Sequence, residues 1–152
     1  HHLLDALNLL GQQRLYRWLA LLFFNPCSAT PLDETLLEAA LTRARLMEQL
    51  GENQFNAEQC ELLFLTGLFS LLDYLLRVPR SLLLSELKMP ELVAQTLKGS
   101  TTILTPYLNL AIQSEQGEIP TESDLAQCHC DAAHFNQQQL EATMWVLTTL
   151  SS

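Results

Sequence analysis

Apolar side chains recur along almost the whole chain with the period of an α-helix, and no segment shows the convincing alternation of a β-strand. The first two helical stretches cover residues 3–10, which end at Gly11, and residues 12–24, which end at Asn25-Pro26. A proline pushes the residue before it away from helical geometry, so a helix is expected to end there. This pattern predicts an all-α fold, arranged as a compact multi-helix bundle.

Two further helices carry strong signals at their ends. One opens at Thr30-Pro31, an N-cap followed by a proline in the first turn, and closes at Gly51. The next follows a residue pair with the spacing of a capping box and is predicted over residues 57–77. Its polar residues form one narrow stripe on an otherwise apolar cylinder, which places this helix at the centre of the bundle. The capping pair is Asn56 and Gln59, and the stripe consists of Gln59, Thr66, Ser70, Asp73 and Arg77.

The predicted helices that follow are shorter. One covers residues 80–87, and another starts at Pro90 and ends before Gly99. The segment 101–116 contains Pro106, so its helix either starts at that proline, with Thr105 as cap, or is kinked by it.

Two more helix starts lie near the end of the chain. After Gly117, the pair Thr121 and Asp124 begins a helix of undefined length. The pair Asn136 and Gln139 is predicted to begin the last helix, which offers several apolar side chains for packing. These are Leu140, Met144, Trp145, Leu147 and Leu150.

Length and composition predict a single helical domain over residues 1–152. Hydrophobic residues make up 48% of the chain, which is enough to fill a core. The net charge of −9 disfavours nucleic-acid binding, because phosphate contacts need clustered Lys and Arg and only 8 are present. No signal peptide is visible, and the most apolar run, Leu62 to Leu76, is too short to span a membrane, so we expect a cytoplasmic protein. Whether His1-His2 is native or belongs to an expression tag stays open.

One cluster has the residue types of a metal site. Cys128, His129 and Cys130 are adjacent, and His134 follows four residues later. Zinc ligands usually come in pairs spaced by about two to four residues, with a second pair across a loop. This cluster has no second pair, so an accidental grouping is favoured and no metal ligands are assigned.

The charged residues inside the predicted helices are interpreted as structural. Asp73 has the spacing of an ion pair with Arg77, one turn later. Arg43 and Arg45 are two positions apart and point to different helix faces, so we expect one of them to form a salt bridge or cap near the bundle edge. A solvated helix face is the interpretation for the remaining pair, Arg14 and Arg17.

The sequence offers no catalytic centre. Away from the N-terminus, the histidines are His129 and His134, and neither a nucleophile elbow nor a Gly-rich phosphate loop is present. We therefore expect a protein that is not an enzyme, with no catalytic residues and no cofactor.

Several segments, taken in their order and spacing, carry a resemblance to a known family. They are 5–11 (Asp-Ala-Leu-Asn-Leu-Leu-Gly), 15–19, 40–45 (Ala-Leu-Thr-Arg-Ala-Arg), 67–73 (Gly-Leu-Phe-Ser-Leu-Leu-Asp), 82–87, 111–118 and 140–145. In this order they resemble the HDOD domain, the non-catalytic relative of the HD phosphohydrolases in bacterial signal transduction. The resemblance is to the version that follows an EAL domain, and it covers essentially the whole chain.

This resemblance implies an HD-domain-related fold, of which the chain would be the C-terminal portion, with earlier helices and an upstream EAL domain absent. HD hydrolases hold metals with a His-Asp pair, whereas the nearest approach here, His129-Cys130-Asp131, does not fit. The resemblance therefore implies a non-catalytic regulatory module that contacts a protein partner, such as the EAL domain, in cyclic-dinucleotide signalling. Apolar surface left by the absent helices leads us to expect a homodimer. Two alternatives stay open: a divergent HD-type metal-dependent phosphohydrolase, and a small zinc-binding helical module.

Overall fold

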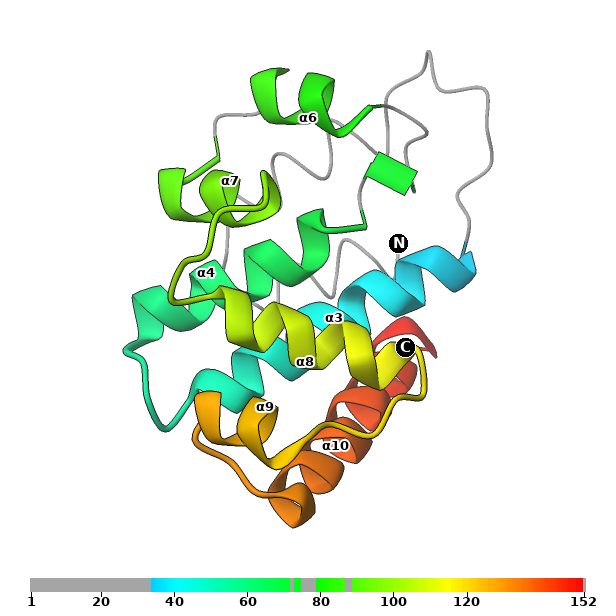
Figure 1. Ribbon diagram of the computed structural model, residues 1–152. Coiled ribbons are helices and arrows are strands. Elements are labelled where there is room, and N and C mark those ends of the chain that lie inside the picture. Colours follow the sequence, from blue (N-terminus) through cyan, green and yellow to red (C-terminus); the bar gives the residue numbers. More distant parts are fainter. Residues whose placement is uncertain (1–33, 72, 75–78, 87–88, 152) are drawn as a thin grey trace.

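The computed structural model describes residues 34–71, 73–74, 79–86 and 89–151, and within these ranges the chain is helical and contains no β-strand (Figure 1). The predicted all-α class is thereby confirmed. The helices predicted over 3–10 and 12–24 lie outside the described residues. The helices that are described, in chain order, are α3 (Glu34–Gly51), α4 (Ala57–Phe69), α6 (Arg80–Glu86), α7 (Glu91–Leu97), α8 (Thr105–Glu115), α9 (Glu122–Gln127) and α10 (Ala132–Ser151).

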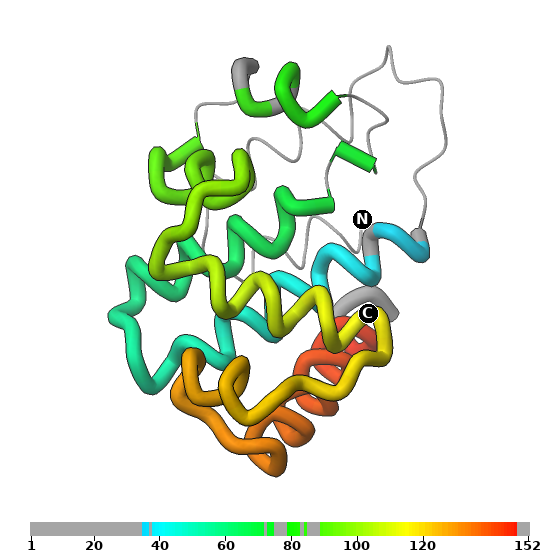
Figure 2. The backbone as a smooth tube through the Cα atoms, viewed as in Figure 1, coloured from blue at the N-terminus to red at the C-terminus, as the bar shows by residue number. Residues whose placement is uncertain are grey.

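Helix α3 lies at the centre and packs against α4, α8 and α10 (Figure 1). Helix α4, which the sequence places centrally, shares this position, because its second half is buried and also contacts α7 and α8. The buried apolar residues of the two helices form the middle of the core: Ala40, Leu41, Ala44, Leu46, Met47, Leu50, Leu63, Phe64, Leu68 and Phe69. Figure 2 shows the chain crossing the α3–α4 pair along α8, turning through α9, and returning along α10.

The two central helices approach closely at Gly67 of α4. A Cβ atom on this glycine would lie 2.6 Å from the Cα of Ala44 and 2.8 Å from its backbone nitrogen. Protein interiors are packed as tightly as organic crystals, so no side chain fits here without moving a helix. Gly67 therefore sets the distance between α3 and α4.

The predicted length of the central helix is wrong, since α4 ends at Phe69 and does not continue to residue 77. The backbone carbonyl of Ser70, which would continue the helical ladder, instead accepts a hydrogen bond of 2.7 Å from Nη2 of Arg80. The Ser70 hydroxyl turns back and donates to the carbonyl of Gly67 over 2.7 Å. The Arg80 side chain thus binds the Ser70 carbonyl oxygen, which another helical turn would need as a hydrogen-bond acceptor.

Most of the predicted helix ends agree with the structure. Asn56 and Thr121 both form the expected capping boxes, with Gln59 and Asp124 as their respective partners. Pro106 lies in the first turn of α8, which starts at Thr105, so the proline marks the helix start and does not kink the helix. The predicted cap is wrong, since the N-cap is Leu104 and Thr105 is already the first helical residue. The starts of α4, α8 and α9 were therefore readable from the sequence.

The predicted start of the last helix is wrong. Helix α10 begins at Ala132, and Asn136, the predicted cap, lies inside its second turn. The capping hydrogen bond comes from Asp131, whose Oδ1 accepts from the backbone nitrogen of His134 over 2.7 Å. Aspartate and asparagine are both good N-caps, so the pattern alone did not separate the two positions.

Candidate functional site

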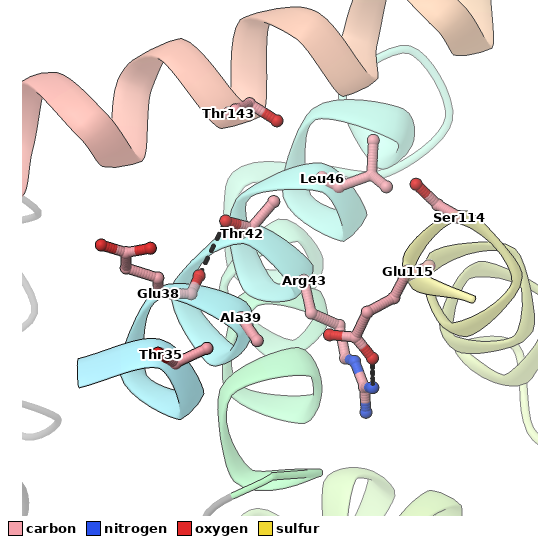
Figure 3. A pocket seen from close by; sticks show the side chains of 10 residues that line it. Thr35, Glu38, Ala39, Thr42, Arg43, Leu46, Ser114, Glu115 and Thr143 are labelled. Carbon is pink, nitrogen blue, oxygen red and sulfur yellow. Dashed lines mark hydrogen bonds and ion pairs between the residues drawn. The ribbon is translucent and has the colours of Figure 1, made fainter. Parts of the chain in front are cut away.

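Arg43 of α3 joins three helices that are far apart in the sequence. The residue is only 8% exposed, and its Nη1 donates a 2.8 Å hydrogen bond to Oγ of Ser70, at the end of α4. Its Nη2 donates to Oε2 of Glu115, at the end of α8, and forms an ion pair with it (Figure 3). A buried charge is tolerated when it is paired and hydrogen-bonded, so this network ties the ends of α4 and α8 to α3.

Arg80 extends the network on the other side of Ser70. Its Nη2 donates to the Ser70 carbonyl, and its Nη1 donates to the carbonyl of Leu97 over 3.3 Å. Its Nε lies 3.5 Å from Oδ2 of Asp73, so the ion pair described for Asp73 is with Arg80. Arg77, the predicted partner of Asp73, lies outside the described residues. Ser70 thus accepts a hydrogen bond from Arg43 at its hydroxyl oxygen and another from Arg80 at its carbonyl oxygen.

Arg45, two positions after Arg43, points to a different face of α3, as the spacing predicts. Its Nη1 pairs with Oε1 of Glu48 on the same helix. Its guanidinium carbon lies 5.1 Å from the centre of the Trp145 ring on α10, within the range of a cation–π interaction. One arginine therefore holds α4 and α8, and the other faces α10.

A cleft of about 350 Å³ lies between α3, α8 and α10, beside the Arg43–Glu115 pair (Figure 3). Its lining is rich in hydroxyl groups, but these already have partners. Thr42 donates to the carbonyl of Glu38 over 2.7 Å, and Thr143 donates to the carbonyl of Gln139 over 2.9 Å. Both terminal nitrogens of Arg43 are engaged as well, so an anion entering this cleft would have to displace Glu115 or Ser70.

The Cys128-His129-Cys130 cluster forms the end of α9. Cys128 is the C-cap, the backbone nitrogen of His129 donates to the Ala126 carbonyl, and that of Cys130 donates to the Leu125 carbonyl. His129 has φ of 55°, in the left-handed region. This hydrogen-bond pattern is a Schellman motif, in which the residue after the cap adopts the left-handed conformation. The cluster therefore lies on the motif that ends α9.

The thiols of this cluster lie in a setting that favours their protonated form. Cys128 is 1% exposed, and burial raises the pKa of its thiol to about 12. Burial also raises the pKa of Cys130, whose Sγ lies 3.6 Å from the Leu125 carbonyl. Zinc binds the thiolate form. Within the described ranges, no three His, Cys, Asp or Glu side chains are placed to hold a metal ion.

Tyr107 of α8 lies near the cysteines of two separate segments, an arrangement that the sequence did not predict. Burial, together with smaller contributions from negative charge on Cys128, Cys130 and Cys60, raises the pKa of Tyr107 to about 12. Its ring makes an edge contact with Phe55, with the ring centres 5.3 Å apart. The 52–56 turn, α8 and the end of α9 are thus packed around one aromatic ring.

Helix α10 leaves large apolar side chains exposed on its outer side. Leu140, Met144 and Leu147 are 58%, 56% and 52% exposed. They are spaced by four and three residues and therefore form one stripe along the helix. The sequence makes these residues available for packing, and in the structure these three lie largely exposed. We call them the α10 stripe.

Comparisons of the chain with protein-family models, with curated proteins and with solved structures found no match. Among the described helices, none is both long and apolar enough to cross a membrane. Arg14 and Arg17 lie outside the described residues, so the structure gives no position for this pair.

Proposed function

We propose that this chain is a non-catalytic regulatory module of a bacterial signal-transduction protein, related to the HDOD domain, which acts by contact with a protein partner. One observation supports the proposal: the segments on which the resemblance rests meet in the structure. Arg43 comes from segment 40–45, Gly67 and Ser70 come from 67–73, and Glu115 comes from 111–118. Segments that resemble one family in order and spacing thus also form one connected network in space.

The chemistry of this network favours a structural role. Each of its charged or polar groups has a partner within the protein, and Arg43 is tied to two helices at once. A catalytic arginine or carboxylate has to be open to a substrate. A network of this kind instead gives rigidity to a scaffold, and a rigid scaffold is what a module that works by contact requires.

The exposed α10 stripe supports the proposal more generally, because it is a surface suited to contact between proteins. Scattered apolar residues on a surface are normal, but Leu140, Met144 and Leu147 lie in one row and are each more than half exposed. Contiguous apolar patches of this kind often mark interaction sites. We further propose that the chain is cytoplasmic and is the C-terminal part of a protein whose earlier part contains an EAL domain, which links it to cyclic-dinucleotide signalling.

Metal content and phosphodiesterase activity separate this proposal from the two alternatives. We expect the purified 152-residue chain to show no stoichiometric metal in elemental analysis. We also expect no hydrolysis of a simple phosphodiester, with or without added Mn²⁺. Hydrolysis that a chelator abolishes would refute the proposal in favour of an HD-type phosphohydrolase. Zinc at one per chain, released by Cys130→Ser and His134→Ala, would instead support the zinc module.

The regulatory part of the proposal is tested on the natural gene. We expect the reading frame upstream of His1 to encode an EAL domain. In that longer protein, deletion of the present chain should change the rate of cyclic-dinucleotide hydrolysis several-fold. An equal rate with and without the chain, at equal EAL-domain concentration and stability, would contradict a regulatory role.

A further inference from the structure

A groove of about 510 Å³ lies between α3 and α10, directly beside the α10 stripe. Leu140, Met144 and Trp145 form its apolar wall, and Arg45 and Gln49 contribute polar atoms. Leu140 and Met144 therefore belong both to the stripe and to the groove. The apolar row and the groove therefore lie on the same face of the molecule.

The groove contains two polar atoms that have no hydrogen-bond partner in the described part of the chain. Gln49 is 6% exposed and donates through Nε2 to Gln138 over 2.6 Å and to Glu141 over 3.3 Å, but its Oε1 is buried and unpaired. Nε of Arg45 is likewise buried without an acceptor. Buried polar atoms are rarely left unpaired, since each costs about 1–3 kcal/mol. Both atoms are enclosed, so an occupant of the groove can pair with them only if the Arg45 and Gln49 side chains turn outward.

The charge of this face points to the nature of the occupant. The whole chain carries a net charge of −9, whereas the 20 residues of α10 contain one acidic residue, Glu141, and no Lys or Arg. Glu141 is itself engaged, because it accepts hydrogen bonds from Gln49 and Gln137. Two copies of an acidic protein repel each other over most of their surfaces, but here two copies can approach with little repulsion.

We propose that the α10 face binds a second copy of this chain and forms a two-fold homodimer, with the stripe of each copy in the groove of the other. A two-fold interface uses the same patch on both subunits, so the patch must be complementary to itself. A face that carries both an apolar row and an apolar recess meets this condition. This inference uses only the α10 face and does not rest on the proposed regulatory function.

Sedimentation velocity of the 152-residue chain tests the dimer over roughly 1–200 μM, the range in which weak homodimers assemble. We expect the 17.2 kDa chain to convert to a species of twice that mass as its concentration rises. Met144→Arg brings two positive charges together across the two-fold axis, and we expect it to weaken the dimer at least tenfold. Ile103→Arg is the matched control, because Ile103 is 50% exposed but does not line the groove, and it should leave the dimer unchanged.

Leu147→Arg, at a position that is 52% exposed, provides an independent variant should Met144→Arg disturb folding. Circular dichroism melting curves like that of the parent chain show that each variant is folded. A parent chain that stays monomeric over the whole range overturns the proposal. So does a dimer that neither arginine on α10 weakens. Because the regulatory proposal is tested by deletion of the chain from the longer protein, either of these results would leave it standing.

Discussion

Replacement of Gly67 by alanine is the most direct test of how the two central helices pack. The added Cβ would lie 2.6 Å from the Cα of Ala44, whereas ordinary contacts begin at 3.4 Å, so α3 and α4 must separate by about 0.8 Å at this point. The atoms that it meets belong to the backbone and cannot rotate away. Arg43, next to Ala44, donates to Ser70 across the same interface over 2.8 Å, so the separation also stretches this hydrogen bond.

Two opposing effects determine the size of the change. Overpacking in a well-packed core costs typically about 1–3 kcal/mol, and the upper end applies because both clashing atoms of Ala44 are backbone. Alanine in place of glycine inside a helix contributes about 1 kcal/mol in the opposite direction. We therefore expect Gly67→Ala to lower the free energy of unfolding by about 2 kcal/mol.

Urea denaturation followed by circular dichroism measures this change. Glu61→Ala is the control, because Glu61 is exposed on the same helix and should change stability by no more than about 0.5 kcal/mol. A larger residue at position 67, such as valine, should cost more than alanine. A Gly67→Ala protein with unchanged or increased stability would refute the close approach of α3 and α4, since only the helix-propensity gain would then remain.

Three further predictions follow from the other contacts. Glu115→Ala should lower the free energy of unfolding, measured by urea denaturation, by about 3 kcal/mol, because it leaves the buried charge of Arg43 unpaired. Arg43→Met should lower it by only about 1 kcal/mol, because the carboxylate that it leaves behind is reached by water. Equal losses for the two variants would contradict this reasoning. His129→Gly should raise the melting temperature by relieving a left-handed backbone worth about 1 kcal/mol, and Gly117→Ala, with φ of 73°, should lower it. The free energy of unfolding should fall as pH rises from about 9 to 12, because the Cys128 thiol, whose pKa is raised to about 12 in the folded protein, loses its proton more readily in the unfolded chain. Cys128→Ala should make this decrease of stability with pH less steep.

Helix starts and ends were predictable where a local hydrogen bond sets them. The capping boxes at Asn56 and Thr121 involve residues three positions apart, so sequence spacing alone specifies them. Gly99 and Gly117 likewise occupy the left-handed position that follows a helix, with φ of 103° and 73°. These signals depend on no residue that is distant along the chain.

The errors arose where a distant residue determines the local structure. The polar stripe of the predicted 57–77 helix includes Ser70, and nothing nearby in the sequence shows that Arg80 takes its carbonyl. The pairing of Arg43 with Glu115 spans 72 positions, so only the fold brings them together. The sequence predicted a structural role for one arginine of this helix but not its partner. Tertiary contacts of this kind override local propensity.

The Cys128-His129-Cys130 cluster shows why residue type alone is a weak guide to a site. The same hydrogen-bond pattern ends α7, α8 and α9, with Gly99, Gly117 and His129 at the corresponding position. A histidine stands where the other two helices have glycine, and two cysteines flank it because one is the buried cap and the other packs back onto the helix. The grouping thus coincides with a helix C-terminal motif that the described helices α7 and α8 also have.

The two arginines of α3 lie in different parts of the molecule. The part around Arg43 maintains the fold, and the part around Arg45 presents a surface. Arg43 binds α4 and α8, so changes at Gly67 or Glu115 should lower stability and leave dimer assembly, measured at temperatures where the protein is folded, unaltered. Met144 is more than half exposed, so Met144→Arg should alter assembly and leave stability nearly unaltered. Arg45 contacts Trp145 and also lines the groove, which makes it the residue where both properties meet. Arg45→Met should therefore weaken the dimer and lower stability together, whereas every other change named here acts on one property alone.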